Sequence, residues 1–360
     1  MNAALPESER EPAPGSYKRD LAPWIVTTGV LVAAGLLSAA VGSVAIPLRD
    51  VIRILLSQLP GVHITPDWPE TFSTILLDIR LPGMALTILT GMALGASGAA
   101  YQGLFRNPLA DPYILGVAAG AGLGAVMAIS FGWATTTSLG LSIIPMVAFT
   151  GGLAAVGLVY ALARVGRTTP TTTLILAGVA VNSFVVALTS LVMLLSSEEL
   201  RRALVWLLGG FSMGGWPPVM ASLPYLIVGV SLLSFLGRPL NVLQFGDEQA
   251  QQLGLNVDRF KLLMVVAASL VAATAVAFAG IIGFVGLVVP HIVRLLWGPD
   301  HRRLIPLAAI GGGAFLLCAD IIARTVIAPR TLPVGIVTAM VGAPFFLWLL
   351  RRARRDLRVW

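Results

Sequence analysis

The sequence is poor in charge, in lysine and in cysteine. Only 11% of its 360 residues are charged, against roughly 25% in an average soluble protein, and 57% are hydrophobic. This composition excludes an ordinary soluble protein and indicates a chain that crosses a membrane many times. The single cysteine, Cys318, excludes a disulfide within the chain. Lysine occurs only at Lys18 and Lys261, neither in a GxxxxGKS or GxxxxGKT frame, so any ATP must be hydrolysed by a partner.

Residues that build catalytic or metal sites are also scarce. The three histidines lie in no HExxH motif and form no Cys/His cluster, which argues against a zinc site. An intramembrane enzyme would need a paired acid and base or a metal, and dispersed histidines do not supply one. We therefore expect no catalytic residue, metal ligand or cofactor in this chain. The net charge of +7 is spread through loops between apolar runs, which indicates membrane topology rather than nucleic-acid binding.

The apolar runs are long enough for ten membrane-spanning helices, each of which needs about 20 residues. Residues 112–163 hold two spans with a break near 135–140, and 203–237 hold one span after a Gly/Pro-rich start. Residues 262–293 form one long span, or two with a tight turn at 280–286. The charge-free runs are 21–48, 81–105, 112–163, 168–197, 203–237, 262–293, 304–319 and 331–350.

Charge favours ten spans over nine. With ten, both termini are cytoplasmic and 17 of the 24 Lys and Arg residues lie inside, as the positive-inside rule requires. We expect an all-α polytopic protein with a polar cytoplasmic tail (1–20), a ten-helix domain (21–350) that includes a cytoplasmic loop (238–261), and a basic cytoplasmic tail (351–360). The start of the chain is too polar for a signal peptide.

Small residues recur at helical spacing in two of the spans. Gly91-x3-Gly95 and Gly116-x3-Gly120-x3-Gly124 are faces that let helix backbones approach closely. The second stretch also matches GxGxxG/A, but a dinucleotide site needs a preceding strand in a βαβ unit. We therefore interpret it as helix packing.

A polar turn between two of these spans carries the most specific motif. Arg106-Asn-Pro-Leu-Ala-Asp-Pro112 is bracketed by prolines, which prevents it from continuing either helix. The longer run from Gly95 to Gly116 resembles the signature of the iron-chelate, cobalamin and haem permease family, the membrane subunits of type II ABC importers. Further matches follow in order at 176–180, 206–211, 280–294, 319–324 and 332–339. The resemblance runs from about residue 72 to the end.

The resemblance implies a ten-helix permease of the type II ABC importer fold. Such a subunit pairs with a second copy in the bacterial inner membrane, binds two cytoplasmic ATPase subunits that hold ATP and magnesium, and receives substrate from a periplasmic binding protein. It catalyses no bond chemistry. The substrate expected from the family is a ferric siderophore, haem or cobalamin.

The resemblance also assigns roles to residues on the cytoplasmic side. Asn107 and Leu109 match a cytoplasmic gate, and Thr171 and Thr172 match a second constriction. Alternatively, 171–173 cap the helix that follows Pro170. The predicted short helix at 246–254 matches the helix that docks on the ATPase; its candidate contact residues are Gly246, Asp247, Glu248, Gln249, Gln252, Leu253 and Gly254. From the residues alone it is a solvated surface helix with glycine at both ends.

On the external side the resemblance assigns binding-protein docking to Arg80 and Arg324, and we add Arg330, also at a helix end, as a third candidate. Arginines at helix ends also anchor a helix at the headgroups. Gly83 departs from the family, which usually has arginine after the Leu-Pro pair. Asp320 lies four residues before Arg324, a spacing that favours an internal ion pair. His291 is interpreted as a packing residue. Asn182 either lines the path or bonds a neighbouring helix, and its role stays open.

A competing hypothesis is an ion-coupled secondary transporter, which needs carboxylates or broken helices near the membrane midplane. Asp320 is the candidate carboxylate for that role, but it has a cation nearby.

Overall fold

The computed structural model describes residues 21–42, 44–133, 142–166, 168–196, 199–210 and 214–356. The predicted tail at 1–20 and the predicted break at 135–140 lie outside these ranges. The long elements are α1 (Ala22–Ala40), α4 (Leu81–Leu104), α5 (Val117–Ser130), α6 (Ile143–Ala163), α7 (Thr171–Leu195), α9 (Pro217–Phe235), α12 (Val257–Ala279), α13 (Val285–Trp297), α14 (His301–Thr325) and α15 (Val334–Asp356). The short elements are α2 (Leu48–Ser57), α3 (Glu70–Thr74), the π-helix η2 (Ile75–Arg80), the 3₁₀-helix η3 (Pro112–Leu115), α8 (Leu200–Leu207), α10 (Gly237–Leu243) and α11 (Asp247–Gln252).

Each of the ten long helices overlaps a predicted apolar run, and α12, α13, α14 and α15 extend beyond their runs into charged residues. Seven of the described helices are long and apolar enough to cross a membrane, and α5, α13 and the apolar part of α15 are shorter. The run at 262–293 divides between α12 and α13, as the charge argument required. Gly280 and Phe284 both have positive φ, 75° and 69°, so the backbone turns sharply between the two helices. The prediction of a ten-helix, all-α membrane protein is confirmed.

Helix α4 is the centre of the larger of two helix groups. It packs against α14, α12, α13 and α9, and nearly all of its C-terminal half is buried. Its glycines permit this. A Cβ at Gly95 would lie 2.1 Å from the carbonyl oxygen of Ala308, and one at Gly91 would lie 2.3 Å from that of Gly312. The small-residue face therefore brings the α4 and α14 backbones into direct contact.

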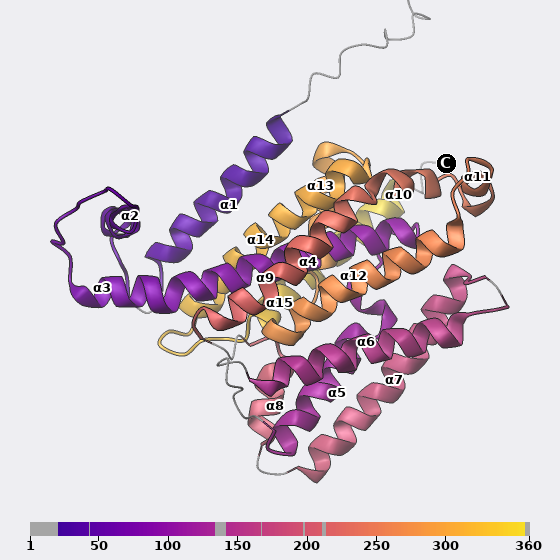
Figure 1. The fold of residues 1–360 in the computed structure, drawn as a ribbon, viewed down its shortest axis with the longest axis horizontal. Coiled ribbons are helices and arrows are strands. Elements are labelled where there is room, and N and C mark those ends of the chain that lie inside the picture. The colour runs from indigo at the N-terminus through magenta and orange to yellow at the C-terminus, as the bar shows by residue number, and fades with distance from the viewer. Residues whose placement is uncertain are drawn as a thin grey trace, which may run out of the picture.

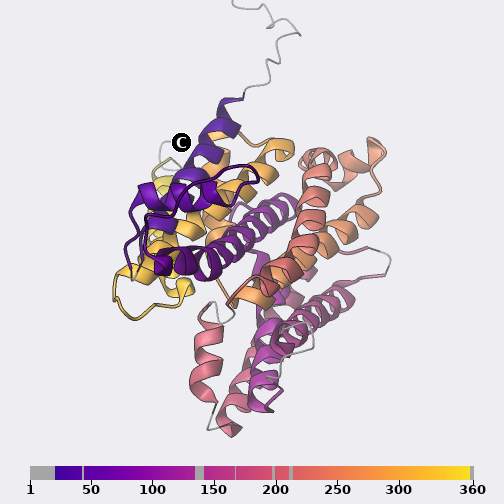
Figure 2. The ribbon, with the colours of Figure 1, turned by 60° about the vertical axis from the view of Figure 1, so that its left-hand side comes forward.

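Helices α5, α6, α7 and α8 form the second group, at the lower side of Figure 1 and again apart from the larger group in Figure 2. A Cβ at Gly120 would lie 2.3 Å from the carbonyl oxygen of Gly151 in α6, and one at Gly124 would lie 2.4 Å from that of Val147. The GxGxxG/A match is thus a helix-packing face. Contacts of α12 with α5 and α6 join the two groups.

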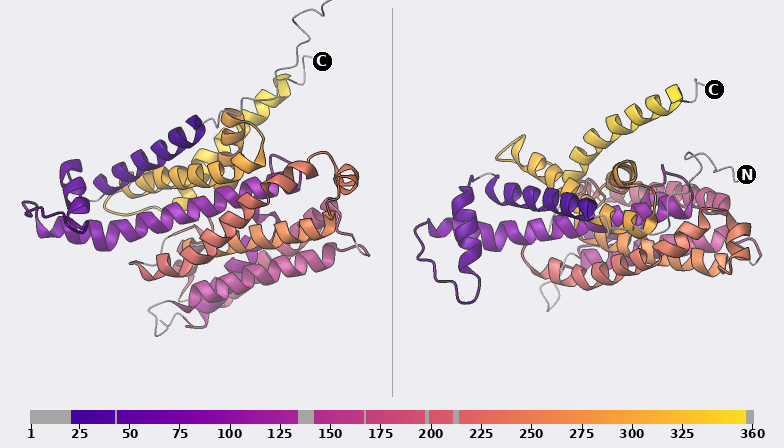
Figure 3. Two further views of the ribbon diagram at one scale, coloured as in Figure 1. Left: turned by 45° about the horizontal axis from the view of Figure 1, so that its top comes forward. Right: turned by 90° about the horizontal axis from the view of Figure 1, so that it is seen from above.

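The last helix continues beyond the apolar part of the chain. Helix α15 runs to Asp356, so the predicted basic tail begins as a continuation of this helix. It contacts α13 and α14, and its C-terminal part projects away from the bundle in Figure 3.

Short elements lie at both ends of the bundle. Elements α2, α3 and η2 lie at the end where α1 finishes and α4 begins. Elements α10 and α11 lie at the opposite end, which also carries the turn between α4 and α5 and the start of α14. These two ends carry all the candidate site residues.

Candidate functional site

Asp247, the first residue of α11, joins that helix to two other elements. Its Oδ1 accepts a hydrogen bond from a guanidinium nitrogen of Arg106 at 3.0 Å, and its Oδ2 accepts one from Lys261 Nζ. The Lys261 side chain is only 4% exposed, whereas that of Asp247 is 37% exposed. Because an isolated buried ammonium is costly, Asp247 fixes Lys261 of α12 and Arg106 of the polar turn together.

The polar turn places Asn107 and Leu109 directly after this ion pair. Arg106 has a φ of 50°, so the chain leaves α4 through a left-handed residue. The Asn107 side chain accepts a hydrogen bond from the Leu109 N–H at 2.9 Å, and its carbonyl accepts one from the Ala110 N–H. Asn107 and Leu109 are exposed. Hydrogen bonds within the turn therefore hold its shape, and the Arg106–Asp247 ion pair links it to α11.

Asp111 closes the turn. Its carboxylate accepts a hydrogen bond from the Tyr113 N–H at 2.8 Å and so caps η3. Burial raises the pKa of this carboxyl to about 6, although the Tyr113 hydrogen bond opposes the shift. The Tyr113 hydroxyl in turn donates to the carbonyl of Ile282, in the turn between α12 and α13.

Asp111→Asn is expected to remove a pH-dependent part of the unfolding free energy. The folded pKa of about 6 exceeds the unfolded value of about 3.9, so the folded chain binds more protons between these values. The stability contributed by this group is full below about pH 4 and falls by about 2–3 kcal/mol as the pH rises to about 6. Unfolding in mixed micelles across this range tests it. Equal pH slopes in the variant and the native chain would contradict the assignment.

Thr171 and Thr172 lie at the start of α7, in the helix group that does not contain α11. Pro170 is the N-cap residue, and among the described residues no side chain caps the start of α7, so the capping interpretation of the three threonines is wrong. The Thr173 hydroxyl instead donates to the carbonyls of Ala163 and Pro170, each at 2.8 Å. Thr172 is exposed and Thr171 is partly buried, which leaves both available for the predicted constriction.

Sequence reasoning missed a second set of bonds at this end. Asn241 of α10 accepts hydrogen bonds from the backbone N–H of His301 at 2.9 Å and lies 2.8 Å from His301 Nδ1, while its amide donates to Asp300. Gln244 donates to the carbonyl of Gly103 in α4. Helix α10, which leads into α11, is thereby held on the start of α14 and the end of α4.

At the opposite end, arginines bind the C-terminus of α1. Arg80 is 7% exposed and donates to the carbonyls of Ala39 at 2.6 Å and of Ala40 and Val44. Ala39 and Ala40 are the last two residues of α1, where no further helical N–H groups can bond their carbonyls, and Val44 lies just beyond the helix. Gly42 leaves room for the guanidinium, since a Cβ there would lie 2.7 Å from it. Arg80 is thus a buried side chain that caps the C-terminus of α1.

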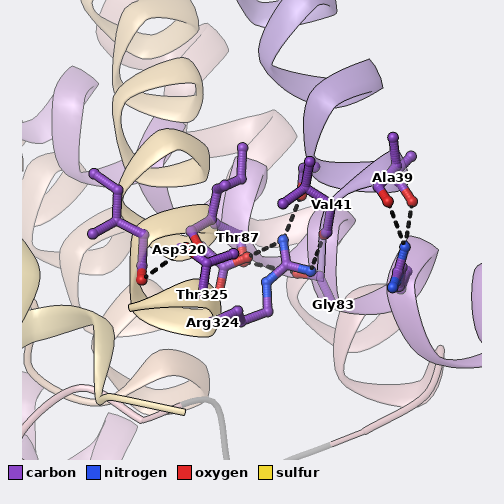
Figure 4. A network of polar contacts seen from close by, with 12 residues as sticks. Ala39, Val41, Gly83, Thr87, Asp320, Arg324 and Thr325 are labelled. Atoms are coloured by element: carbon purple, nitrogen blue, oxygen red, sulfur yellow. Dashed lines mark hydrogen bonds and ion pairs between the residues drawn. The ribbon is translucent and has the colours of Figure 1, made fainter. Parts of the chain in front are cut away.

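Arg324 joins α14 to the same segment. It donates to Ser38 Oγ at 2.6 Å and pairs with Asp320 at 2.8 Å, which confirms the predicted ion pair (Figure 4). Figure 4 shows Arg324 between Asp320 and the end of α1 at Val41. Arg330 lies on an exposed loop after α14. Of the three predicted docking arginines, Arg80 is buried, Arg324 is partly buried and Arg330 is exposed.

A cavity of about 410 Å³ opens beside this network. Arg80, Asp320 and Arg324 line it, together with residues of α8, of the segment after α8 and of the loop before α15. The cavity therefore joins both helix groups at this end.

Two residues of α13, Arg294 and His291, face other helices within the bundle. Arg294 donates to the side-chain oxygen of Gln102 at 2.9 Å, and the Gln102 amide donates to the carbonyls of Gly286 and Leu287. His291 packs edge-on against Phe345 of α15, as expected of a packing residue, yet neither ring nitrogen has a hydrogen-bond partner among the described residues. Asn182 is partly buried on α7.

Comparison with known proteins points to one family. The model of the FecCD transport family matches residues 30–352. The cobalamin import system permease protein BtuC of Halobacterium salinarum is 44% identical over 91% of this chain and 95% of its own length. The uncharacterized ABC transporter permease protein YvrB of Bacillus subtilis is 43% identical over 94% and 95%. A solved inward-facing structure, of an ABC transporter assigned to the metal-chelate type, has a TM-score of 0.76 at 28% identity and covers 92% of this chain and 98% of its own.

Proposed function

Because this chain belongs to the FecCD transport family, a family of ABC transporter permeases, we propose that it is the membrane-spanning subunit of a binding-protein-dependent importer for a metal chelate. Ferric siderophores, haem and cobalamin are the candidate substrates. ATP hydrolysis in two partner subunits drives uptake into the cytoplasm, and a second copy of the chain completes the translocation path.

The observation that carries this proposal is the link between α11 and the turn that holds Asn107 and Leu109. A partner that displaces α11 pulls on Asp247, which bonds Arg106, the residue before Asn107. The same displacement acts on α12 through Lys261 and, through α10, on the start of α14. The free energy of partner binding at the surface of α11 is thereby transmitted to the turn that holds Asn107 and Leu109. This coupling needs no carboxylate that carries ions through the membrane.

The distribution of charge supports the orientation. The end with α10 and α11 is cytoplasmic in the proposal, as is the basic C-terminal part of α15, in agreement with the positive-inside rule. The end with Arg80, Arg324 and Arg330 then faces the binding protein. In a Gram-negative cell this corresponds to the inner membrane, with both termini in the cytoplasm.

Changing the charge of α11 and of Leu253, the residue that follows it, is expected to abolish ATPase binding without unfolding the permease. Glu248 and Leu253 are exposed, and Leu253 is 68% exposed, so Glu248→Lys and Leu253→Asp change the surface and leave the Asp247 contacts intact. Co-purification of the ATPase from membranes measures the effect. The matched control is Arg164→Glu, an exposed charge change at the same end and outside α11. Normal ATPase recovery with both α11 variants would contradict the docking assignment.

Arg330→Glu is expected to weaken binding-protein affinity at low salt. An exposed ion pair contributes about 0–1 kcal/mol, so Arg330→Ala should lose up to about fivefold and Arg330→Glu more, because it adds repulsion. Both losses should shrink as salt increases. Arg324→Glu is the harsher change, since it also places like charges beside Asp320 and removes a bond to α1. Unchanged affinity of Arg330→Glu at low salt would remove this residue from the docking surface.

A further inference from the structure

Helix α2 presents three kinds of side chain on three sides. Val51 and Ile54 share one side and are fully buried in the cluster formed with α1, α4 and α14. Leu48, Ile52 and Leu56 follow at intervals of four, so they share a second side of the helix, and they are 47%, 42% and 41% exposed. The third side is polar and consists of Arg49, Asp50, Arg53 and Ser57.

Helix α2 lies across the bundle. Figure 1 looks along its axis, whereas α4 and α12 run across the same view, and the two views of Figure 3 agree with this arrangement. It follows the last turn of α1 and packs against that helix. The spans run along the membrane normal, so α2 lies roughly in the plane of the membrane at the end of the bundle.

Tryptophans mark the level of the membrane surface at this end. Trp133 follows the end of α5 and Trp216 precedes α9, and they are 47% and 41% exposed. Trp68 lies in the loop after α2, with the Arg53 guanidinium 5.4 Å from its ring centroid. Tryptophan is enriched where a membrane meets water, because its ring is apolar and its N–H is polar.

We propose that α2 is an interfacial helix whose exposed stripe of Leu48, Ile52 and Leu56 inserts into the leaflet opposite α11. A helix fully in water would have one buried and one polar side, and a membrane-spanning helix would lack the polar side. In the proposed position the buried side of α2 faces protein, the exposed apolar stripe faces acyl chains, and the polar side faces water. Helix α1, which precedes α2, also exposes apolar side chains, among them Val30, Val32 and Leu37.

Charge on α2 fits the same position. At 100° per residue, exposed Arg49 lies beside Leu56 at the border between the apolar stripe and the polar side. Its guanidinium is placed to bind lipid phosphate. Arg53, farther into the polar side, bonds Asp67 and so stays with the loop. An interfacial helix combines such an apolar stripe with basic residues beside it.

Spin-label accessibility in lipid nanodiscs tests the proposal on the whole chain. In a Cys318→Ser background, a nitroxide is attached at Ile52→Cys on the stripe, at Ser57→Cys on the polar side and at Val30→Cys on α1. Molecular oxygen concentrates in lipid and a nickel chelate in water. We expect Ile52→Cys to favour oxygen severalfold, as Val30→Cys does, and Ser57→Cys to favour the nickel chelate.

Two results would overturn it. If Ile52→Cys favours the nickel chelate as Ser57→Cys does, α2 lies in water. If Ile52→Cys is shielded from both reagents, protein covers the stripe; dipolar broadening between two labels would then identify a second copy. The measurement involves no ATPase, binding protein or substrate, so its outcome is independent of the proposed transport function.

Discussion

Asp247→Ala is expected to lower the free energy of unfolding by about 3 kcal/mol, because it leaves Lys261 charged and buried without its partner. The Lys261 side chain is 4% exposed and its ion-pair partner is Asp247. Asp247→Asn should cost nearly as much, since an amide does not balance the ammonium. Detergent-titrated unfolding in mixed micelles measures both variants.

The double variant Asp247→Asn/Lys261→Met separates this cause from general damage to α11. Removing both charges eliminates the uncompensated ammonium, so we expect most of the stability to return, with a coupling energy of about 2 kcal/mol. The double variant still lacks the ion pair to Arg106. Its ATP-driven uptake should therefore remain far below that of the native chain even though it is folded. A double variant no more stable than Asp247→Asn would contradict the buried-pair account, and normal uptake would contradict the link to the gate.

Gly95→Ala is expected to destabilise the chain by about 3 kcal/mol or more, because it forces α4 and α14 apart. The added Cβ would lie 2.1 Å from the Ala308 carbonyl oxygen and 2.9 Å from its carbon. Both are backbone atoms, so no side chain can rotate away. Since α4 contacts α1, α9, α12, α13 and α14, the displacement would spread through the larger helix group. Loss of the folded fraction in membranes and earlier unfolding in micelles are the readouts.

Gly83→Ala is the matched control on the same helix. A Cβ at Gly83 meets nothing within 4 Å, and alanine has the better helix propensity by about 1 kcal/mol. We expect this variant to be as stable as the native chain or slightly more so. If Gly95→Ala behaves like Gly83→Ala, the backbone contact between α4 and α14 is not as close as the structure shows.

The ten spans could be predicted because a membrane imposes a simple rule on sequence. Each span needs a long apolar run, and the charges between the runs fix their direction. The division of 262–293 followed from this rule, and Gly280 and Phe284 now supply its turn. The packing faces at Gly91, Gly95 and Gly120 could also be predicted, since small residues at intervals of four typically mark close helix packing inside a membrane.

Bonds between distant residues could not be predicted in the same way. The Asp320–Arg324 pair is local and was found from its spacing, whereas Arg80 reaches back to Ala39 and Asp247 reaches Arg106 only in the folded chain. Arg80 had two interpretations at sequence level, docking or anchoring. Burial against α1 adds a third, capping, which requires knowledge of where α1 ends. Helix α2 was missed because it is too short for a span and too polar on average.

The most direct test of the transport account is uptake by membranes that contain or lack this chain, with haem, cobalamin and a panel of ferric siderophores as substrates. The account predicts that deletion abolishes uptake of one of these chelates, and that an inactive variant of the co-purifying ATPase abolishes the same uptake. Chelate uptake that survives loss of the ATPase but collapses with the ion gradient would contradict the account and favour an ion-coupled transporter.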